Sequence, residues 1–141
     1  MPAAAGKTMT TVLWGAAAAV WFGMMTWLSH QPGPGTSRTS RALAEELHSL
    51  LPGIKTESLN RLLRKTAHPM LFAGLAVLVG LALQSASCGP GLLPAGMVQL
   101  LWCWGDEATK RMVPGRHFSW LDVGLNAAGT LLGSGAVLLL G

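Results

Sequence analysis

Long stretches without charge dominate this sequence of 141 residues. No Asp, Glu, Lys or Arg occurs over 8–37, 69–105 or 123–141. The hydrocarbon core of a bilayer is about 30 Å thick, and a helix needs about 20 residues to cross it. The first and last stretches can each supply one crossing, and the middle stretch is long enough for two. Only 11% of the residues are charged, whereas ordinary globular chains have about 25%, so a soluble enzyme core and a disordered chain are disfavoured.

We therefore predict an all-α integral membrane bundle of four transmembrane helices, forming a single domain over 1–141. The spans are expected near 9–29, 67–85, 90–105 and 121–140. The third is short and contains Pro94 and Gln99, so a re-entrant segment is the alternative there. The first resembles a signal peptide, but no A-x-A-like cleavage site follows it, and we interpret it as an anchor helix.

The loop over 30–66 has two parts. Gln31–Ser37 is rich in Pro and Gly and is expected to be irregular. Apolar residues then recur at helical spacing: Leu43, Leu47, Leu50, Leu51 and Ile54. This pattern predicts a short amphipathic helix over 40–51, closed by Pro52-Gly53, that lies on the bilayer surface or on the bundle. A partner-binding helix is the alternative.

Four spans place the loops 30–66 and 106–122 on one side of the membrane and both termini on the other. These loops hold all the Lys and Arg residues except Lys7. The positive-inside rule would make both loops cytoplasmic. Basic residues that belong to a binding site are weaker topological markers, so the residues alone leave the orientation open.

A basic segment follows Thr56, a residue type that often caps helices. Five positions share an arc of roughly 100° on a helix: Arg61, Arg64, Lys65, His68 and Phe72. Pro69 either kinks this helix or starts the second span, leaving His68 extended. The basic positions form either a collar that contacts lipid phosphates or a wall that binds one anionic headgroup, with His68 as a titratable member.

The segment 105–122 pairs carboxylates with cations. Asp106 and Glu107 lie at the expected C-terminus of the third span, where they oppose the helix dipole, whereas Asp122 near the next N-terminus is favourable. A nearby cation is therefore needed to neutralise Asp106 and Glu107. Candidates are Lys65, His68, Lys110, Arg111 and Arg116. This predicts an interfacial network of salt bridges between the loops.

One face of the fourth span combines polar and small residues: Asp122, Asn126, Gly129, Gly133 and Ala136. Gly129 and Gly133 form a G-x-x-x-G motif, which lets another helix backbone approach closely and could support a homo-oligomer. Asn126, about one turn inside the membrane, needs a hydrogen-bond partner. A packing seam and a functional site are both consistent with this face.

Other classes of site receive little support from the sequence. Cys88 and Cys103 are expected roughly 20 Å apart along a helix, beyond the reach of a disulfide, so we predict two free thiols. No Cys/His spacing is typical of a metal site, and no cofactor is predicted. Nucleic-acid binding is disfavoured although the isoelectric point is about 9.7, because the basic residues flank spans.

The motifs together resemble the VanZ-like family of membrane proteins. They are Arg64-Lys65-x-x-His68, Asp106-Glu107, Val113-Pro114-Gly115-Arg116 and Asp122-x-x-x-Asn126-x-x-Gly129, with Ser29-x-Gln31 after the first span. The resemblance covers about residues 10–140. The chain departs from the family pattern at three positions: Phe72 where members usually have Tyr, Lys110 where they have Gln, and Thr109 where many have His.

The resemblance implies a multi-pass protein of the bacterial cytoplasmic membrane. The family is named for a protein that confers low-level resistance to the glycopeptide teicoplanin, and most members have no established biochemical activity. That resistance implies that the loops 30–66 and 106–122 face outward and the termini inward. The candidate ligand-binding residues are Lys65, His68, Asp106, Glu107, Arg116, Asp122 and Asn126.

Three functional hypotheses follow. We favour a non-enzymatic protein that binds or shields an anionic envelope lipid, such as an isoprenoid phosphate or wall precursor. Cationic side chains would contact its phosphate, and the carboxylates would hold those cations in place. The second hypothesis is an intramembrane enzyme with His68 or Glu107 as general acid or base, although no recognised nucleophile accompanies them. The third is a structural protein that assembles through Gly129 and Gly133.

Overall fold

The computed structural model describes residues 2–141, with side chains described for 4–32 and 37–141. The described chain is all-α, as predicted, and contains no strand. Its helices are α1 (Pro2–Ser29), α2 (Gly33–Leu50), α3 (Thr56–Ser85), α4 (Leu92–Thr109) and α5 (Trp120–Leu140), with 3₁₀ turns at Gly89–Gly91 and Lys110–Met112.

Among the described residues, three helices are long and apolar enough to cross a membrane. These are Ala4–Ser29 within α1, Thr56–Ser85 and Trp120–Leu140. By length and composition the chain is a membrane protein. The helix expected as the third span, α4, is not among the three. It contains Gln99 in addition to Asp106 and Glu107.

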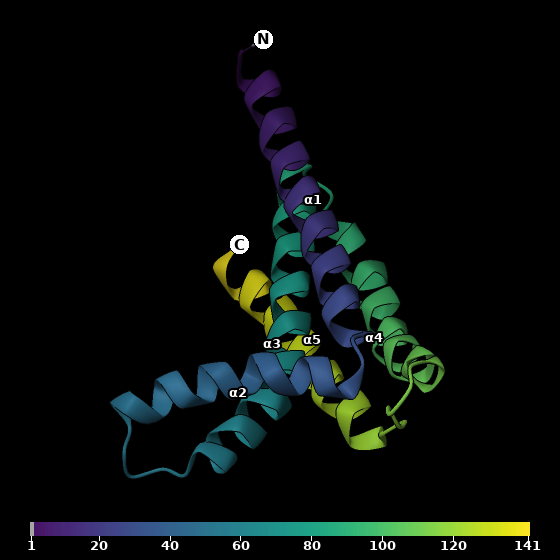
Figure 1. The fold of residues 1–141 in the computed structure, drawn as a ribbon. Helices are drawn as coiled ribbons and strands as arrows, with labels where there is room; N and C mark the ends of the chain where they lie inside the picture. The colour runs from purple at the N-terminus through teal and green to yellow at the C-terminus, as the bar shows by residue number, and fades with distance from the viewer. Residues whose placement is uncertain (1) are drawn as a thin grey trace.

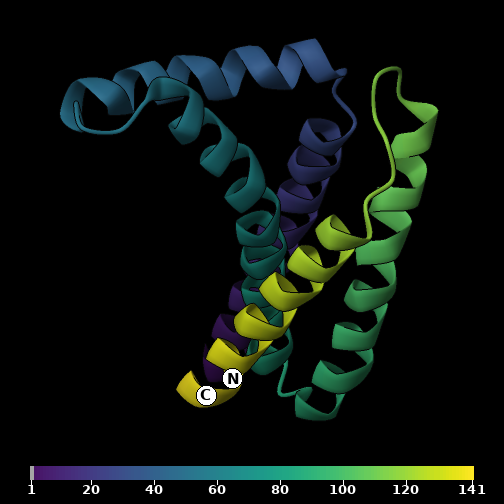
Figure 2. The same cartoon turned by 90° about the horizontal axis from the view of Figure 1, so that it is seen from below.

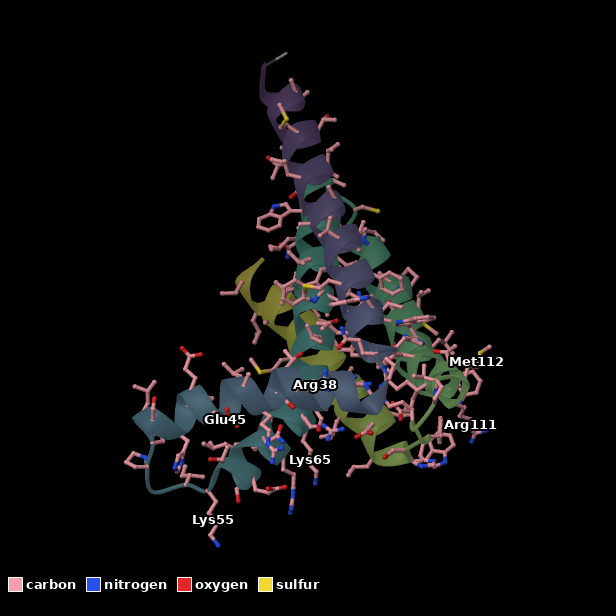
Figure 3. The ribbon with its side chains drawn as sticks, in the orientation of Figure 1. Arg38, Glu45, Lys55, Lys65, Arg111 and Met112 are labelled. Carbon is pink, nitrogen blue, oxygen red and sulfur yellow. The ribbon has the colours of Figure 1, made fainter. Side chains whose placement is uncertain are left out.

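Helix α3 forms the centre of the bundle. It packs against α5, α1 and α2, while α4 packs mainly against α5. Figure 2 shows both termini at one end of the bundle, with α2 and the connection from α4 to α5 at the other. Charged side chains such as Arg38, Glu45, Lys65 and Arg111 lie at this second end (Figure 3). The two polar loops therefore lie at the same end of the bundle, as predicted.

Helix α3 contains both the basic segment predicted to be helical after Thr56 and the span predicted near 67–85. It begins at Thr56, with Lys55 and not Thr56 at the N-cap position, and it continues through Pro69, so the alternative in which a new helix starts at Pro69 is wrong. His68 is therefore helical. The first turns of α3 pack against α2, and both Ala44 of α2 and Leu59 of α3 are buried.

Helix α2 is longer than the amphipathic helix predicted over 40–51. It starts at Gly33, so most of the segment expected to be irregular is helical. Pro34 lies in the first turn, where its missing N–H costs nothing and its fixed φ favours the helix. The helix ends at Leu50, before Pro52-Gly53, as predicted. Together with the first turns of α3 it forms an arm to one side of the bundle (Figure 1).

The G-x-x-x-G motif marks a close crossing of α5 with α3. A Cβ added at Gly129 would collide with the carbonyl oxygen of Pro69, and one at Gly133 with that of Ala73. The predicted close approach of another helix is thus confirmed within a single chain. A homo-oligomer built on these glycines would have to displace α3.

The apolar core lies where α1, α3 and α4 meet. It contains Ala18, Met25, Phe72, Leu75 and Cys103. Trp21 Nε1 also donates a hydrogen bond of 2.9 Å to the Leu71 carbonyl oxygen, which ties α1 to α3. Cys103 is buried and Cys88 exposed, and both thiols are free, as predicted.

Candidate functional site

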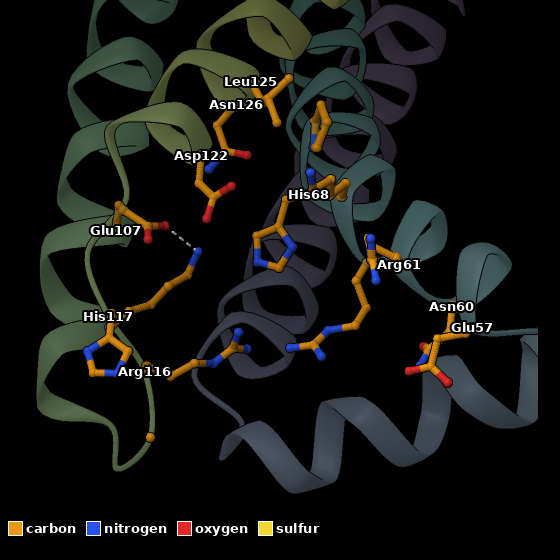
Figure 4. Close-up of a pocket in the computed structure, with 15 residues that line it drawn as sticks. Glu57, Asn60, Arg61, His68, Glu107, Arg116, His117, Asp122, Leu125 and Asn126 are labelled. Atoms are coloured by element: carbon orange, nitrogen blue, oxygen red, sulfur yellow. Dashed lines mark hydrogen bonds and ion pairs between the residues drawn. The ribbon is translucent and has the colours of Figure 1, made fainter.

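A cavity occupies the space where α3 and α5 separate on the polar side of their crossing (Figure 4). Its volume is about 440 Å³, and its walls come from α3, the end of α4, the 115–117 segment and the start of α5. Six of the seven predicted site residues line it: Lys65, His68, Glu107, Arg116, Asp122 and Asn126. The structure therefore brings together side chains that are far apart in the sequence.

Asp106, the seventh predicted residue, does not line the cavity. It is fully buried, and its Oδ2 accepts a hydrogen bond of 2.8 Å from Ser29 Oγ. Adjacent helical residues point about 100° apart, so Glu107 can line the cavity while Asp106 faces α1. Asp106 supports the wall of the cavity and is not itself available to a ligand.

Lys110 forms ion pairs with both carboxylates at the end of α4. Its Nζ lies 3.1 Å from Asp106 Oδ2 and 2.7 Å from Glu107 Oε2, and the residue is only 4% exposed. The prediction that a cation compensates Asp106 and Glu107 is confirmed. The prediction of salt bridges between the loops is wrong for the described residues, because both of their ion pairs lie within this one helix end.

Hydrogen bonds, rather than ion pairs, join the end of α1 to the second polar loop. Arg116 donates from Nη2 to the Ser29 carbonyl oxygen at 3.2 Å and from Nε to the Gln31 carbonyl oxygen at 3.3 Å. His30 Nε2 lies 2.8 Å from Thr109 Oγ1. A guanidinium at a helix C-terminus is also favoured by the helix dipole. Sequence reasoning missed His30, and Ser29 entered only through the family resemblance.

Arg116 is half-buried, and its surroundings perturb it. Burial lowers the pKa of the guanidinium from its ordinary value, and the nearby Arg64 acts in the same direction, whereas Glu107 and Asp106 oppose the change. An arginine keeps its proton in proteins nonetheless. Arg116 thus brings a permanent positive charge to the cavity.

The start of α5 holds Glu107 in place. The Ser119 backbone N–H donates to Glu107 Oε1 at 3.2 Å, and the Ser119 side chain caps the helix by accepting from the Asp122 N–H at 3.3 Å. A carboxylate beside a helix N-terminus is electrostatically favourable. Glu107 therefore has fixed partners on both sides.

The outer wall of the cavity is rich in positive charge. Five cations line the cavity against three carboxylates: Arg61, Arg64, Lys65, Lys110 and Arg116 against Glu57, Glu107 and Asp122. Within the described chain, Arg61, Arg64 and Lys65 take part in neither of the two ion pairs. A concave surface with an excess of one charge concentrates ions of the opposite sign. The cavity is suited to an anion.

The inner end of the cavity has unused hydrogen-bonding capacity. Asn126 is fully buried, and both its Oδ1 and its Nδ2 lack a hydrogen-bond partner, as does the buried Nε2 of His68. Leaving a buried polar group without a partner costs about 1–3 kcal/mol. The partner expected for Asn126 is therefore not supplied by the described chain. Arg61, Arg64, Lys110 and His117 also line the cavity beyond the predicted set.

Among the described residues, no group of three or more His, Cys, Asp or Glu side chains could hold a metal ion. Comparisons with protein-family models, with curated proteins and with solved structures found no match for this chain. The functional assignment therefore depends on the geometry and chemistry of the cavity.

Proposed function

We propose that this protein binds the phosphate headgroup of an anionic envelope lipid at the membrane interface. The observation that supports this most directly is the cavity itself. Cations without an ion-pair partner stand on its outer wall, and the buried Asn126 amide and His68 Nε2 lack partners at its inner end. Ionised phosphate oxygens accept hydrogen bonds from both kinds of donor.

The position of the cavity suits a lipid headgroup. In the proposed arrangement α4 is a fourth crossing beside α1, α3 and α5, and the arm formed by α2 lies along the bilayer surface. Three exposed tryptophans flank the cavity end of the bundle: Trp27, Trp104 and Trp120, at 65%, 52% and 71% exposure. Tryptophan is enriched at the level of lipid headgroups, so the cavity would open at that level.

The resemblance to VanZ-like proteins suggests a cellular setting for this binding. We propose the bacterial cytoplasmic membrane, with the cavity on its outer face and a contribution to teicoplanin-type resistance by shielding an envelope lipid or wall precursor. The departures at Thr109 and Lys110 have structural uses here: Thr109 contacts His30, and Lys110 neutralises Glu107. Phe72 lies in the apolar core.

A structural role is the second candidate, since the end of α4 is fastened to α1 by the bond from Ser29 to Asp106. On that account the cavity residues would affect stability and not lipid binding. Catalysis by His68 or Glu107 remains a hypothesis that no described contact favours over binding.

Thermal unfolding in the presence of lipid tests the proposal. The protein is purified in a neutral maltoside detergent, and its unfolding midpoint is followed by tryptophan fluorescence with and without phosphatidylglycerol. A ligand at 100 times its dissociation constant stabilises a protein by about 2.7 kcal/mol, which is a readily measured shift. We expect phosphatidylglycerol to raise the midpoint and phosphatidylcholine, which has no net charge, to leave it unchanged.

Two matched arginine variants locate the effect. Arg64→Gln removes a cation from the cavity wall and should abolish the lipid-dependent shift. Arg111→Gln removes an exposed arginine that lies over the Phe118 ring, 4.8 Å from its centroid, and does not line the cavity, so it should retain the shift. An equal loss in both variants, or a shift that survives Arg64→Gln, would show that lipid does not bind in the cavity.

A further inference from the structure

The cavity is larger than a phosphate group requires. Its α3 wall runs from Glu57 to Pro69, a distance of roughly 18 Å at 1.5 Å per helical residue. Its volume of about 440 Å³ lies within the range of roughly 300–1,000 Å³ typical of small-molecule pockets. A phosphate on the cationic wall would leave room for a further group of the ligand deeper in the cavity.

The two ends of the cavity differ in chemistry. Figure 4 shows Arg61 and Arg116 toward the α2 side, whereas His68, Asp122 and Asn126 face one another on the side toward the helix crossing. The outer end offers positive charge. The inner end offers an amide, an imidazole nitrogen and a carboxylate.

The amide of Asn126 defines what the inner group must be. It presents one acceptor, Oδ1, and one donor group, Nδ2, and both lack a partner. An ionised phosphodiester has acceptors only, so it could satisfy Nδ2 but would leave Oδ1 without a donor. Interchanging the oxygen and nitrogen positions of the Asn126 amide does not alter this requirement, because neither position has a partner. Both atoms are enclosed by the described chain, so a ligand must displace the side chains that cover them.

Two common headgroup substituents could supply the missing donor, a hydroxyl and an ammonium group, but only one of them also supplies an acceptor. A hydroxyl group does so without charge. An ammonium group only donates, and it would be repelled by the cations that outnumber carboxylates around the cavity. A neutral hydroxyl therefore fits the inner end better than an amine.

We infer that the ligand is a phosphodiester whose alcohol part has a free hydroxyl, such as a glycerol or sugar headgroup. Its phosphate lies against Arg61, Arg64 and Arg116, and its hydroxyl bonds to Asn126. This inference rests on the proposed function, because it names the class of lipid that the same cavity would recognise.

Two lipids with the same net charge test the inference. Phosphatidylglycerol and phosphatidylmethanol with identical acyl chains are both anionic phosphodiesters, and only the first has hydroxyl groups. Each is titrated into the wild-type protein in neutral detergent, and the dissociation constant is obtained from the rise in unfolding midpoint. We expect phosphatidylglycerol to bind at least about tenfold more tightly, the discrimination that 1.4 kcal/mol provides. Equal binding of both lipids would overturn the hydroxyl assignment and leave the proposed function intact, whereas binding of neither would overturn both.

Matched variants of two amide side chains identify which of them hydrogen-bonds to the hydroxyl. Asn126→Leu should bind phosphatidylglycerol and phosphatidylmethanol with equal dissociation constants. Both should be close to that of the wild type for phosphatidylmethanol. Gln99→Leu makes the equivalent change at another buried side chain with a partnerless oxygen, which lies on a separate apolar groove, and it should keep the wild-type preference. A preference that survives Asn126→Leu would contradict the assignment. The comparison of lipids on the wild-type protein stands even if Asn126→Leu does not fold.

Soluble probes separate a lipid from a free ligand of the same chemistry. Glycerol 3-phosphate and inorganic phosphate are each tested as competitors of phosphatidylglycerol. Competition by glycerol 3-phosphate alone would assign the same hydroxyl recognition to a free ligand, and no competition by either would assign it to the lipid. Equal competition by inorganic phosphate would contradict recognition of the hydroxyl.

Discussion

A cluster of buried charged residues and a single buried amide lie at this end of the bundle, and they differ in how many of their polar atoms have hydrogen-bond partners. At the end of α4, Lys110 pairs with both Asp106 and Glu107, and Ser29 and Ser119 donate further hydrogen bonds to them, so that Asp106 Oδ1 is the one oxygen of the two carboxylates without a partner. On α5, the Asn126 amide has no partner at all. The first group has what it needs to hold the fold together. The second is incomplete in a way that weakens the fold, which is typical of a position retained for binding.

The largest effect is expected from breaking the satisfied group. Lys110→Met leaves two buried carboxylates without their cation, and removing one partner of a buried ion pair costs about 3–5 kcal/mol. Chemical denaturation in detergent should show a loss of this size. Arg111→Met, at an exposed neighbour, should cost no more than about 1 kcal/mol, the value of its contact with the Phe118 ring. Equal stability of the two variants would mean that the cluster does not hold the end of α4.

A smaller loss is expected at the helix crossing that forms the floor of the cavity. Gly129→Ala places a methyl group against the Pro69 carbonyl, and such overpacking typically costs about 1–3 kcal/mol. Gly124→Ala on the same helix meets open space and should gain up to about 1 kcal/mol from helix propensity. The difference between the two unfolding midpoints measures how much the close contact between α3 and α5 contributes to stability. Similar midpoints would indicate that α3 and α5 are not in close contact.

The smallest effect, and one of opposite sign, is expected at the unsatisfied group. Asn126→Leu replaces a partnerless amide with an apolar side chain of similar volume, and it should stabilise the lipid-free protein by about 1 kcal/mol. With saturating phosphatidylglycerol the order should reverse, because only the wild type forms hydrogen bonds between the amide and the lipid hydroxyl. A variant that is less stable than the wild type without lipid would show that Asn126 has a partner in the native fold.

The sequence was sufficient for the all-α class and for the convergence of most of the cavity residues. The uncharged stretches located the three helices that are long and apolar enough to cross a membrane. The expectation that the two polar loops lie at one end of the bundle was also met (Figure 2). The sequence was not sufficient for the start of α2 at Gly33, inside a Pro- and Gly-rich segment that we expected to be irregular. Nor could it decide which of Asp106 and Glu107 faces the cavity, because that depends on the rotation of α4 about its axis. The partners of Arg116 are backbone carbonyls, for which side-chain patterns give no signal.

Native mass spectrometry of the purified protein tests the central claim most directly. The protein is extracted from bacterial membranes in a mild detergent and examined for retained phospholipid, alongside Arg64→Gln and Arg111→Gln. The cavity predicts one anionic, hydroxylated phospholipid bound to the wild type and to Arg111→Gln, and its loss from Arg64→Gln. Wild-type protein without lipid, or the same lipid retained by Arg64→Gln, would contradict the account.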